Sequence, residues 1–163
     1  MELVTSEFNL KTDIIDFKNK MTTLDTLKIW VNHSVCTYQG AERIEITKET
    51  DRLKIRTQFK EETFNETPKW KLVYEKEIPI SDTLWKIEEF FKRNSHRQKS
   101  KEKEHGILQV SHNKKTTHYF TNGLIDLNKF IADYSNTMKK LYPENKNNIY
   151  GVEVLEIENI QDE

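Results

Sequence analysis

The sequence predicts a single α+β domain over residues 1–163, in which a mainly antiparallel sheet of about six strands has two or three helices covering one face. Two observations lead to this fold class. Apolar residues recur every three or four positions in some segments, as on a helix, and at every second position in others, as on a half-buried strand. Short polar turns separate consecutive strand segments, and such turns join antiparallel neighbours.

Length and composition agree with one globular domain. The chain has 163 residues, of which 35% are hydrophobic and 33% charged, and its eight Phe, six Tyr and three Trp can fill a core. Cys36 is the single cysteine, so no internal disulfide can form. The first residues are acidic where a signal peptide needs positive charge, and no run of about 20 apolar residues follows. We therefore expect a cytoplasmic protein with no membrane partner.

The first segment predicts an amphipathic helix that begins near Thr12 or Asp13. The following residues, 27–39, allow two interpretations: the helix continues and ends before Gly40, or a strand forms with alternate residues inward. The helix is the favoured interpretation. The helical stripe comprises Leu10, Ile14, Phe17, Met21 and Leu24, and the inward strand residues would be Leu27, Ile29 and Val31.

From Arg43 the apolar period is two, which predicts three strands. The first two are joined by a turn at Lys48–Asp51, and the third ends at Pro79. The first two strands place Ile44, Ile46, Leu53, Ile55 and Phe59 on one face. The third strand places Trp70, Leu72, Tyr74, Ile78 and Ile80 on one face.

A short helix over residues 82–93 is predicted next, with Ser81 as N-cap, a hydrophobic staple between Ile80 and Trp85, and a buried stripe. That stripe comprises Leu84, Ile87 and Phe91. Residues 93–106 contain many charges and no apolar side chain before Gly106, so we interpret them as a charged mobile connector. A hairpin with its turn near Asn113 and Lys114 follows.

The strongest helical pattern covers residues 126–141. Asp126 is the predicted cap, Ile125 and Phe130 form a predicted staple, and Pro143 ends the run. Beyond it, residues 148–159 change phase after Val154, which predicts a strand with a bulge, or a strand buried on both faces, that inserts among the earlier strands. Residues 159–163 form an acidic tail.

No established catalytic or cofactor motif is found. The four glycines are too few and too scattered for a P-loop or a dinucleotide fingerprint. His33 and Cys36 form half of a zinc-type pattern, but a structural site needs four ligands. His112 and His118 flank the hairpin turn and could approach each other across it, although exposed histidines in a turn are the simpler interpretation. We expect no metal, no cofactor and no enzymatic activity, with an enzyme of unrecognised type as the second alternative.

Charge is unevenly distributed along the chain. Residues 92–118 carry eight Lys or Arg against two Glu, whereas residues 119–163 carry four against eight Asp or Glu. Such asymmetry can steer a charged partner. A nucleic-acid-binding accessory protein that uses the basic 92–118 block is the first alternative, but between Arg93 and His118 no aromatic residue is available for base stacking.

The sequence therefore favours a non-enzymatic protein that binds another protein, such as a toxin or a host enzyme, and inhibits it by occlusion, as bacterial immunity proteins and phage inhibitors do. The predicted contact surface is an acidic patch of Glu153, Glu156, Glu158 and Asp162. The alternative surface is a basic patch of Arg97, Lys99, Lys101, Lys103, Lys114 and Lys115.

Overall fold

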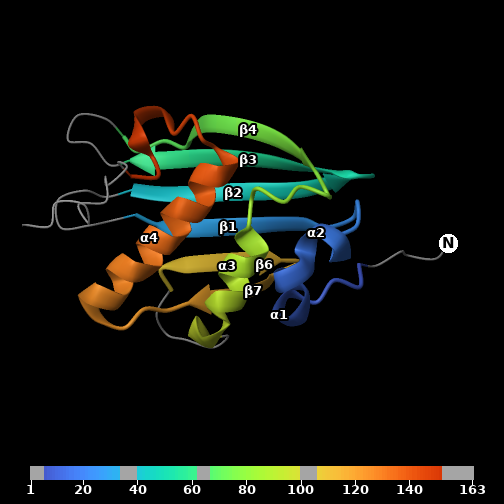
Figure 1. Cartoon of the computed structure of the whole chain (residues 1–163), viewed down its shortest axis with the longest axis horizontal. Helices are drawn as coiled ribbons and strands as arrows, with labels where there is room; N and C mark the ends of the chain where they lie inside the picture. Colours follow the sequence, from blue (N-terminus) through green and yellow to red (C-terminus); the bar gives the residue numbers. More distant parts are fainter. Residues whose placement is uncertain (1–5, 34–39, 62–66, 100–105, 152–163) are drawn as a thin grey trace, which may run out of the picture.

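Seven antiparallel strands form one sheet in a computed structural model that describes residues 6–33, 40–61, 67–99 and 106–151 (Figure 1). The strand order is β4-β3-β2-β1-β6-β7-β5. The strands are β1 (Thr26–Asn32), β2 (Gly40–Glu49), β3 (Arg52–Glu61), β4 (Lys71–Pro79), β5 (Gln98–Lys99), β6 (Leu108–His112) and β7 (Lys115–Tyr119). The predicted α+β class and the antiparallel sheet are confirmed.

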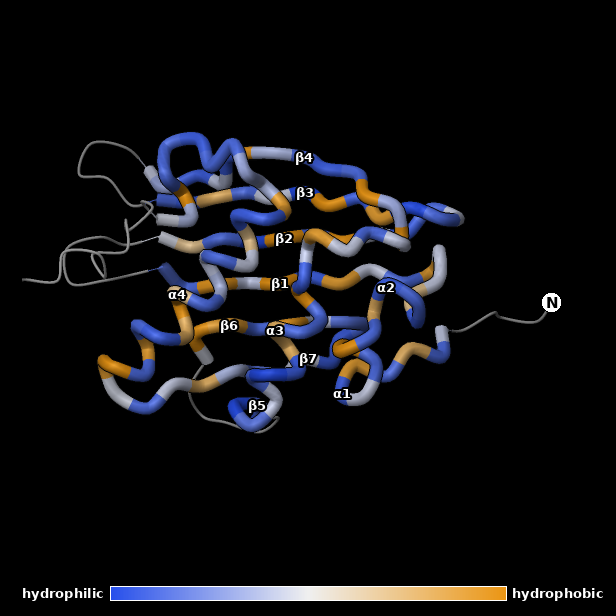
Figure 2. Tube along the Cα trace, in the orientation of Figure 1, coloured by the Kyte–Doolittle hydropathy of each residue, from blue (hydrophilic) through white to orange (hydrophobic). Residues whose placement is uncertain are grey.

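The helices lie together on one face of this sheet (Figure 1). They are α1 (Leu10–Asp13), α2 (Phe17–Lys20), α3 (Ile87–Arg93) and α4 (Gly123–Leu141), with short 3-10 turns η1 (Ile14–Asp16), η2 (Ser95–Arg97) and η3 (Lys146–Asn148). Hydropathy alternates along the central strands, so one face of the sheet is apolar and packs against the helices (Figure 2). None of the helices in this described part is both long enough and apolar enough to cross a membrane.

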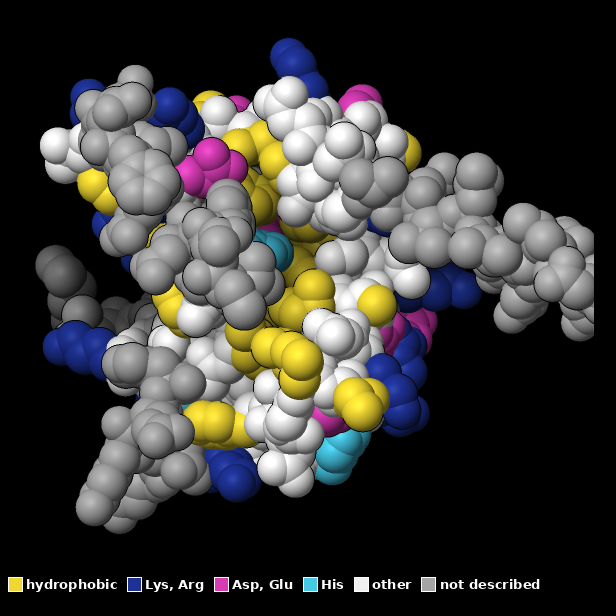
Figure 3. All heavy atoms as spheres, turned by 90° about the vertical axis from the view of Figure 1, so that its left-hand side faces the viewer, with side chains coloured by type: hydrophobic (Ala, Val, Ile, Leu, Met, Phe, Trp, Pro, Cys, Tyr) yellow, Lys and Arg dark blue, Asp and Glu magenta, His cyan; other side chains and the backbone are white. Residues whose placement is uncertain are grey.

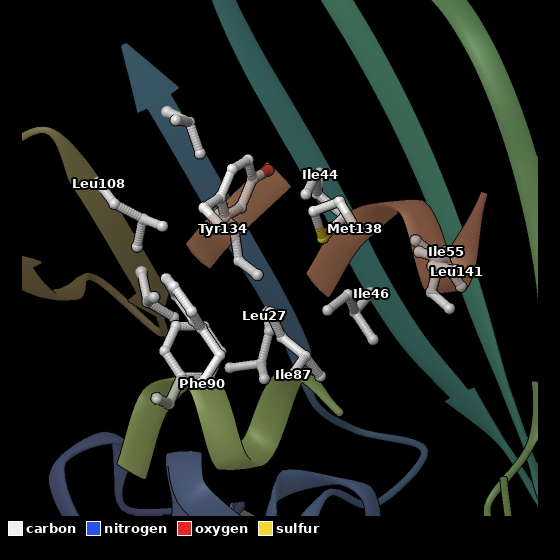
Figure 4. Packing of buried hydrophobic residues seen from close by; sticks show 14 of the residues in the cluster. Leu27, Ile44, Ile46, Ile55, Ile87, Phe90, Leu108, Tyr134, Met138 and Leu141 are labelled. Atoms are coloured by element: carbon white, nitrogen blue, oxygen red, sulfur yellow. The ribbon is translucent and has the colours of Figure 1, made fainter. Parts of the chain in front are cut away.

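The core lies between the sheet and the helices, and it includes Leu10, Ile14 and Phe17 of the N-terminal helical segments. Side chains from α3 and α4 pack against side chains from β1, β2, β3 and β6 (Figure 4). The labelled residues of the helical layer are Ile87, Phe90, Tyr134, Met138 and Leu141. The labelled residues of the sheet layer are Leu27, Ile44, Ile46, Ile55 and Leu108. The inward residues predicted for the first two strands are all buried.

The N-terminal helix is shorter than predicted, and residues 26–32 form strand β1. The favoured helix over 27–39 is therefore wrong for residues 27–33, and residues 34–39 lie outside the described residues. The helix ends at Lys20 because the chain turns at residues 22–25. There the Asp25 carboxylate accepts from the amide of Thr22 at 2.7 Å and from its hydroxyl at 3.1 Å. Leu24, predicted in the helical stripe, is exposed, while the other predicted stripe residues are buried.

Strand β4 contains a bulge that the regular alternation did not predict. Thr57 of β3 lies opposite Tyr74, but the next residue, Gln58, lies opposite Leu72, so Val73 is an extra residue in β4. Tyr74 therefore faces the core as predicted, whereas Leu72 faces outward and is 49% exposed. The prediction that Trp70, Leu72 and Tyr74 share one face is wrong.

Both later helices begin at other residues than predicted. Helix α3 begins at Ile87, so Ser81 is too far before it to be its cap. In the segment before the helix, the Asp82 carboxylate accepts a hydrogen bond from the Trp85 amide at 2.9 Å. Leu84 is exposed, although the other two predicted stripe residues are buried. Helix α4 begins at Gly123, so Asp126 lies in its first turn and Ile125 is exposed rather than stapled to Phe130.

The hairpin of β6 and β7 is confirmed, with Asn113 and Lys114 both at positive φ in a two-residue turn. The predicted connector is wrong in its first part. Residues 95–99 form η2 and β5, and β5 pairs with β7. Residues 100–105 lie outside the described residues, as do Val152 onward and thus most of the predicted last strand and the acidic tail.

Candidate functional site

A buried carboxylate lies at the centre of the site. Glu42 is in phase with Ile44 and Ile46 on β2, so its side chain faces the helices, and its residue exposure is 0%. Its two oxygens accept from the hydroxyl of Tyr134 on α4 at 2.7 Å and from the hydroxyl of Tyr150 at 2.6 Å. These donors compensate for removing a charged group from water.

The direction of these hydrogen bonds follows from the tyrosine ionisation. Burial, and then the charge of Glu42, raise the pKa of both Tyr134 and Tyr150 well above the usual range. Each phenol therefore keeps its proton and donates it to the carboxylate. Because the Tyr150 proton is used for Glu42, the hydroxyl of Tyr74, 2.5 Å away, is the donor to Tyr150.

His33, the residue directly after β1, completes this cluster. Its Nε2 lies 2.8 Å from Oε1 of Glu42, and its ring stacks on Phe59 with centroids 5.5 Å apart. Because a carboxylate only accepts, Nε2 carries a proton and donates it. We call Glu42, His33, Tyr74, Tyr134 and Tyr150 the Glu42 network.

A pocket of about 630 Å³ opens beside His33, at the end of the sheet where β1 and β3 finish and β4 begins. We call it the His33 pocket. Phe59, Val73, Ile131 and Ile149 supply its apolar lining, and Lys69, Lys71 and Glu61 supply its charges. Figure 3 shows this end of the molecule, with exposed apolar side chains near its centre and Lys and Arg side chains around its margin.

The opposite surface of β1–β4, which we call the outer face, is the second candidate. Register places one row of residues across it: Gln109, Trp30, Arg43, Gln58 and Leu72. The guanidinium of Arg43 stacks 4.3 Å from the ring centre of Trp70 and donates to Gln58 at 2.6 Å. A hollow of about 380 Å³ lies between these residues and the adjoining row.

The adjoining row of the outer face alternates in charge. It consists of Lys28, Glu45, Arg56 and Glu75, which are cross-strand neighbours. Arg56 approaches Glu75 to 3.5 Å, and both side chains remain about half exposed. This row therefore contributes no net charge, and the excess positive charge on this part of the outer face comes from Arg43 and Lys60, which lie beside Trp70.

The predicted contact residues do not form one described surface. Glu153, Glu156, Glu158 and Asp162 of the acidic patch lie outside the described residues, as do Lys101 and Lys103 of the basic patch. Arg97 is engaged within the fold, because it donates two hydrogen bonds to Asp126, at 2.6 and 2.7 Å. Lys99 lies near the end of β7, whereas Lys114 and Lys115 lie at its beginning.

The histidines are not arranged as the sequence suggested. His112 faces inward, is buried, and bonds through Nε2 to Asp25 at 2.7 Å, whereas His118 alternates to the other side of the hairpin. The two rings therefore do not approach each other, and His112 is not an exposed turn residue. Cys36 lies outside the described residues. Across the described ranges, no group of three or more His, Cys, Asp or Glu side chains could hold a metal ion.

Comparison with protein-family models, with curated proteins and with solved structures gives no match to this chain. The site is therefore defined by its own chemistry. Sequence reasoning missed Glu42, although a signal was present: a glutamate occupies an inward position of a strand, two residues before Ile44. Its two tyrosine donors could not be found in the same way, because they lie 92 and 108 residues further along the chain.

Proposed function

We propose that this chain is a non-enzymatic protein-binding protein that inhibits a partner by covering its functional surface, and that the outer face makes the contact. The observation that carries the proposal is the row containing Trp30, Arg43 and Leu72, with Trp70 stacked on Arg43. Tryptophan and arginine dominate the binding energy of protein interfaces. The helices lie on the other side of the sheet, so they leave this row accessible (Figure 1).

Charge on the outer face favours a protein over a nucleic acid. Binding to a phosphate backbone depends on a cluster of Lys and Arg without opposing carboxylates. Here Glu45 and Glu75 alternate with Lys28 and Arg56, which would repel phosphates at every second position. A protein surface of mixed charge can satisfy such a row.

The row also indicates what the partner presents. The exposed side chain of Leu72 suits an apolar residue of the partner, while the guanidinium of Arg43 and the Nζ of Lys60 suit a carboxylate next to it. A partner segment with an apolar residue beside Asp or Glu satisfies both requirements. A bacterial toxin or a host enzyme, neutralised through such a segment, is the class of partner that the proposal names.

The test begins with capture of the partner from the native cell and continues with the two purified proteins. We expect the wild-type chain to form a complex with the captured protein and to suppress its activity. Trp30→Ala and Arg43→Ala should each weaken the complex by at least tenfold, since central Trp and Arg contacts are worth more than about 1.4 kcal/mol.

Matched controls come from the helical side of the molecule. Arg93→Ala and Leu124→Ala remove an arginine and a leucine, both exposed and remote from the outer face. Both should leave the affinity unchanged, whereas Leu72→Ala should reduce it. A reconstituted complex that tolerates Trp30→Ala and Arg43→Ala would refute the outer face as the contact surface. A captured partner whose activity is unaffected by saturating amounts of this chain would refute inhibition.

A further inference from the structure

The His33 pocket is separate from the outer face. The bulge in β4 directs Lys71 and Val73 to the helical side of the sheet, while Leu72 between them faces outward. The pocket therefore has its own lining, and its contents do not depend on the surface proposed to contact a protein. Its volume lies within the range of small-molecule sites, which is about 300–1,000 Å³.

The apolar part of the lining comes from four segments of the described chain. Phe59 belongs to β3, Val73 to β4 and Ile131 to α4, and Ile149 follows η3. Each of these side chains packs against the core, so the wall is fixed by the fold. An apolar ligand body gains free energy by covering this wall, because both surfaces then leave water.

The charged part of the lining favours an anion. Among the described residues of the lining, Lys69 and Lys71 supply two positive charges, and Glu61 supplies one negative charge. His33 adds a fixed polar group, since its Nε2 is held by the buried Glu42 and its ring by Phe59.

We propose that the His33 pocket binds a small organic carboxylate with an apolar body. The apolar chain lies against Phe59, Val73 and Ile131, and the carboxylate lies toward Lys69 and Lys71. His33 is already held by Glu42 and Phe59, so its side chain loses little entropy when a ligand binds. This inference does not rest on the proposed function, and either can fail without the other.

Octanoate is the probe, titrated into the full chain while backbone amide shifts are followed by NMR. We expect shifts at pocket residues and a Kd on the order of 1 mM or tighter for a ligand of this size. Octan-1-ol, which has the same chain without the charge, should bind at least tenfold more weakly. Octylammonium should bind more weakly still, because it places a cation beside the two lysines.

Two variants locate the binding. Lys69→Met combined with Lys71→Met should weaken octanoate binding at least tenfold, whereas Lys28→Met combined with Lys54→Met removes the same charge from the outer face and should have little effect. Both changes lie at exposed side chains, so the fold is retained. Ser135→Trp should fill the pocket and abolish binding, with thermal unfolding as a check that the variant is folded.

Three results would overturn the proposal. These are no saturable shifts at pocket residues, equal affinity for octanoate and octan-1-ol, or equal losses for the two double variants. The last result would indicate general charge attraction rather than a site.

Discussion

Replacement of Glu42 by leucine should destabilise the protein strongly, because the carboxylate is the shared acceptor of the Glu42 network. Leucine has a similar size but accepts no hydrogen bond. The hydroxyl of Tyr134 is then buried without an acceptor, and the paired hydroxyls of Tyr74 and Tyr150 have an acceptor for only one of their two protons. His33 lines the pocket and can bond to water instead.

The loss in the free energy of unfolding follows from the two buried hydroxyl protons that no longer have an acceptor. Each buried donor that loses its acceptor costs about 1–3 kcal/mol, so Glu42→Leu should lower the free energy of unfolding by about 2–6 kcal/mol. Glu42→Gln keeps one oxygen acceptor and should cost less. Glu45→Leu, an exposed change three residues along the same strand, should stay within about 0.5 kcal/mol.

Urea unfolding followed by circular dichroism measures these differences, and a double-mutant cycle tests the cause. Tyr134→Phe should destabilise the wild-type chain by about 1.5–3 kcal/mol because it removes a hydrogen bond to a charged acceptor. In the Glu42→Leu background the same change removes a stranded hydroxyl and should be neutral or stabilising. Equal costs of Tyr134→Phe in both backgrounds, or a loss below about 1 kcal/mol for Glu42→Leu, would refute the reasoning.

Three further predictions concern other parts of the molecule. Burial raises the pKa of Tyr74, Tyr119, Tyr134 and Tyr150, to about 12 for Tyr119. Above about pH 10 the unfolded state loses protons that the native state keeps, so the free energy of unfolding should fall by up to about 1.4 kcal/mol per pH unit for each tyrosine. Tyr119→Phe should make this fall with pH less steep. Lys18→Met should cost about 3–5 kcal/mol in urea unfolding, because the buried ammonium bonds to the Trp85 carbonyl at 2.8 Å and lies near two carboxylates, whereas exposed Lys20→Met should be near neutral. Lys114→Gly should raise the melting temperature, since Lys114 has φ +68° and glycine relieves about 1 kcal/mol of left-handed strain; an unchanged or lower value would contradict this.

Regular patterns allowed much of the fold to be predicted. Strands β2 and β3 and the hairpin of β6 and β7 were found because alternation and turn residues are local signals. Helix α4 was found because its apolar stripe continues over four turns. Errors occurred where a side chain distant in sequence ends or extends an element. The turn before β1 is an example, since the Asp25 carboxylate that holds it also accepts from His112 of β6.

The sequence by itself determined the α+β class, the inward apolar residues of β2 and β3, and an amphipathic α4. For β1 it offered the correct inward residues as one of two alternatives. It did so because burial of apolar surface imposes a period that can be read along the chain. Tertiary structure alone decided where the sites lie. One extra residue, Val73, turns Leu72 and Trp70 to the outer face and Lys71 into the His33 pocket. A bulge depends on how two strands pair, and the tyrosine donors to Glu42 come from distant segments, so neither has a local signal.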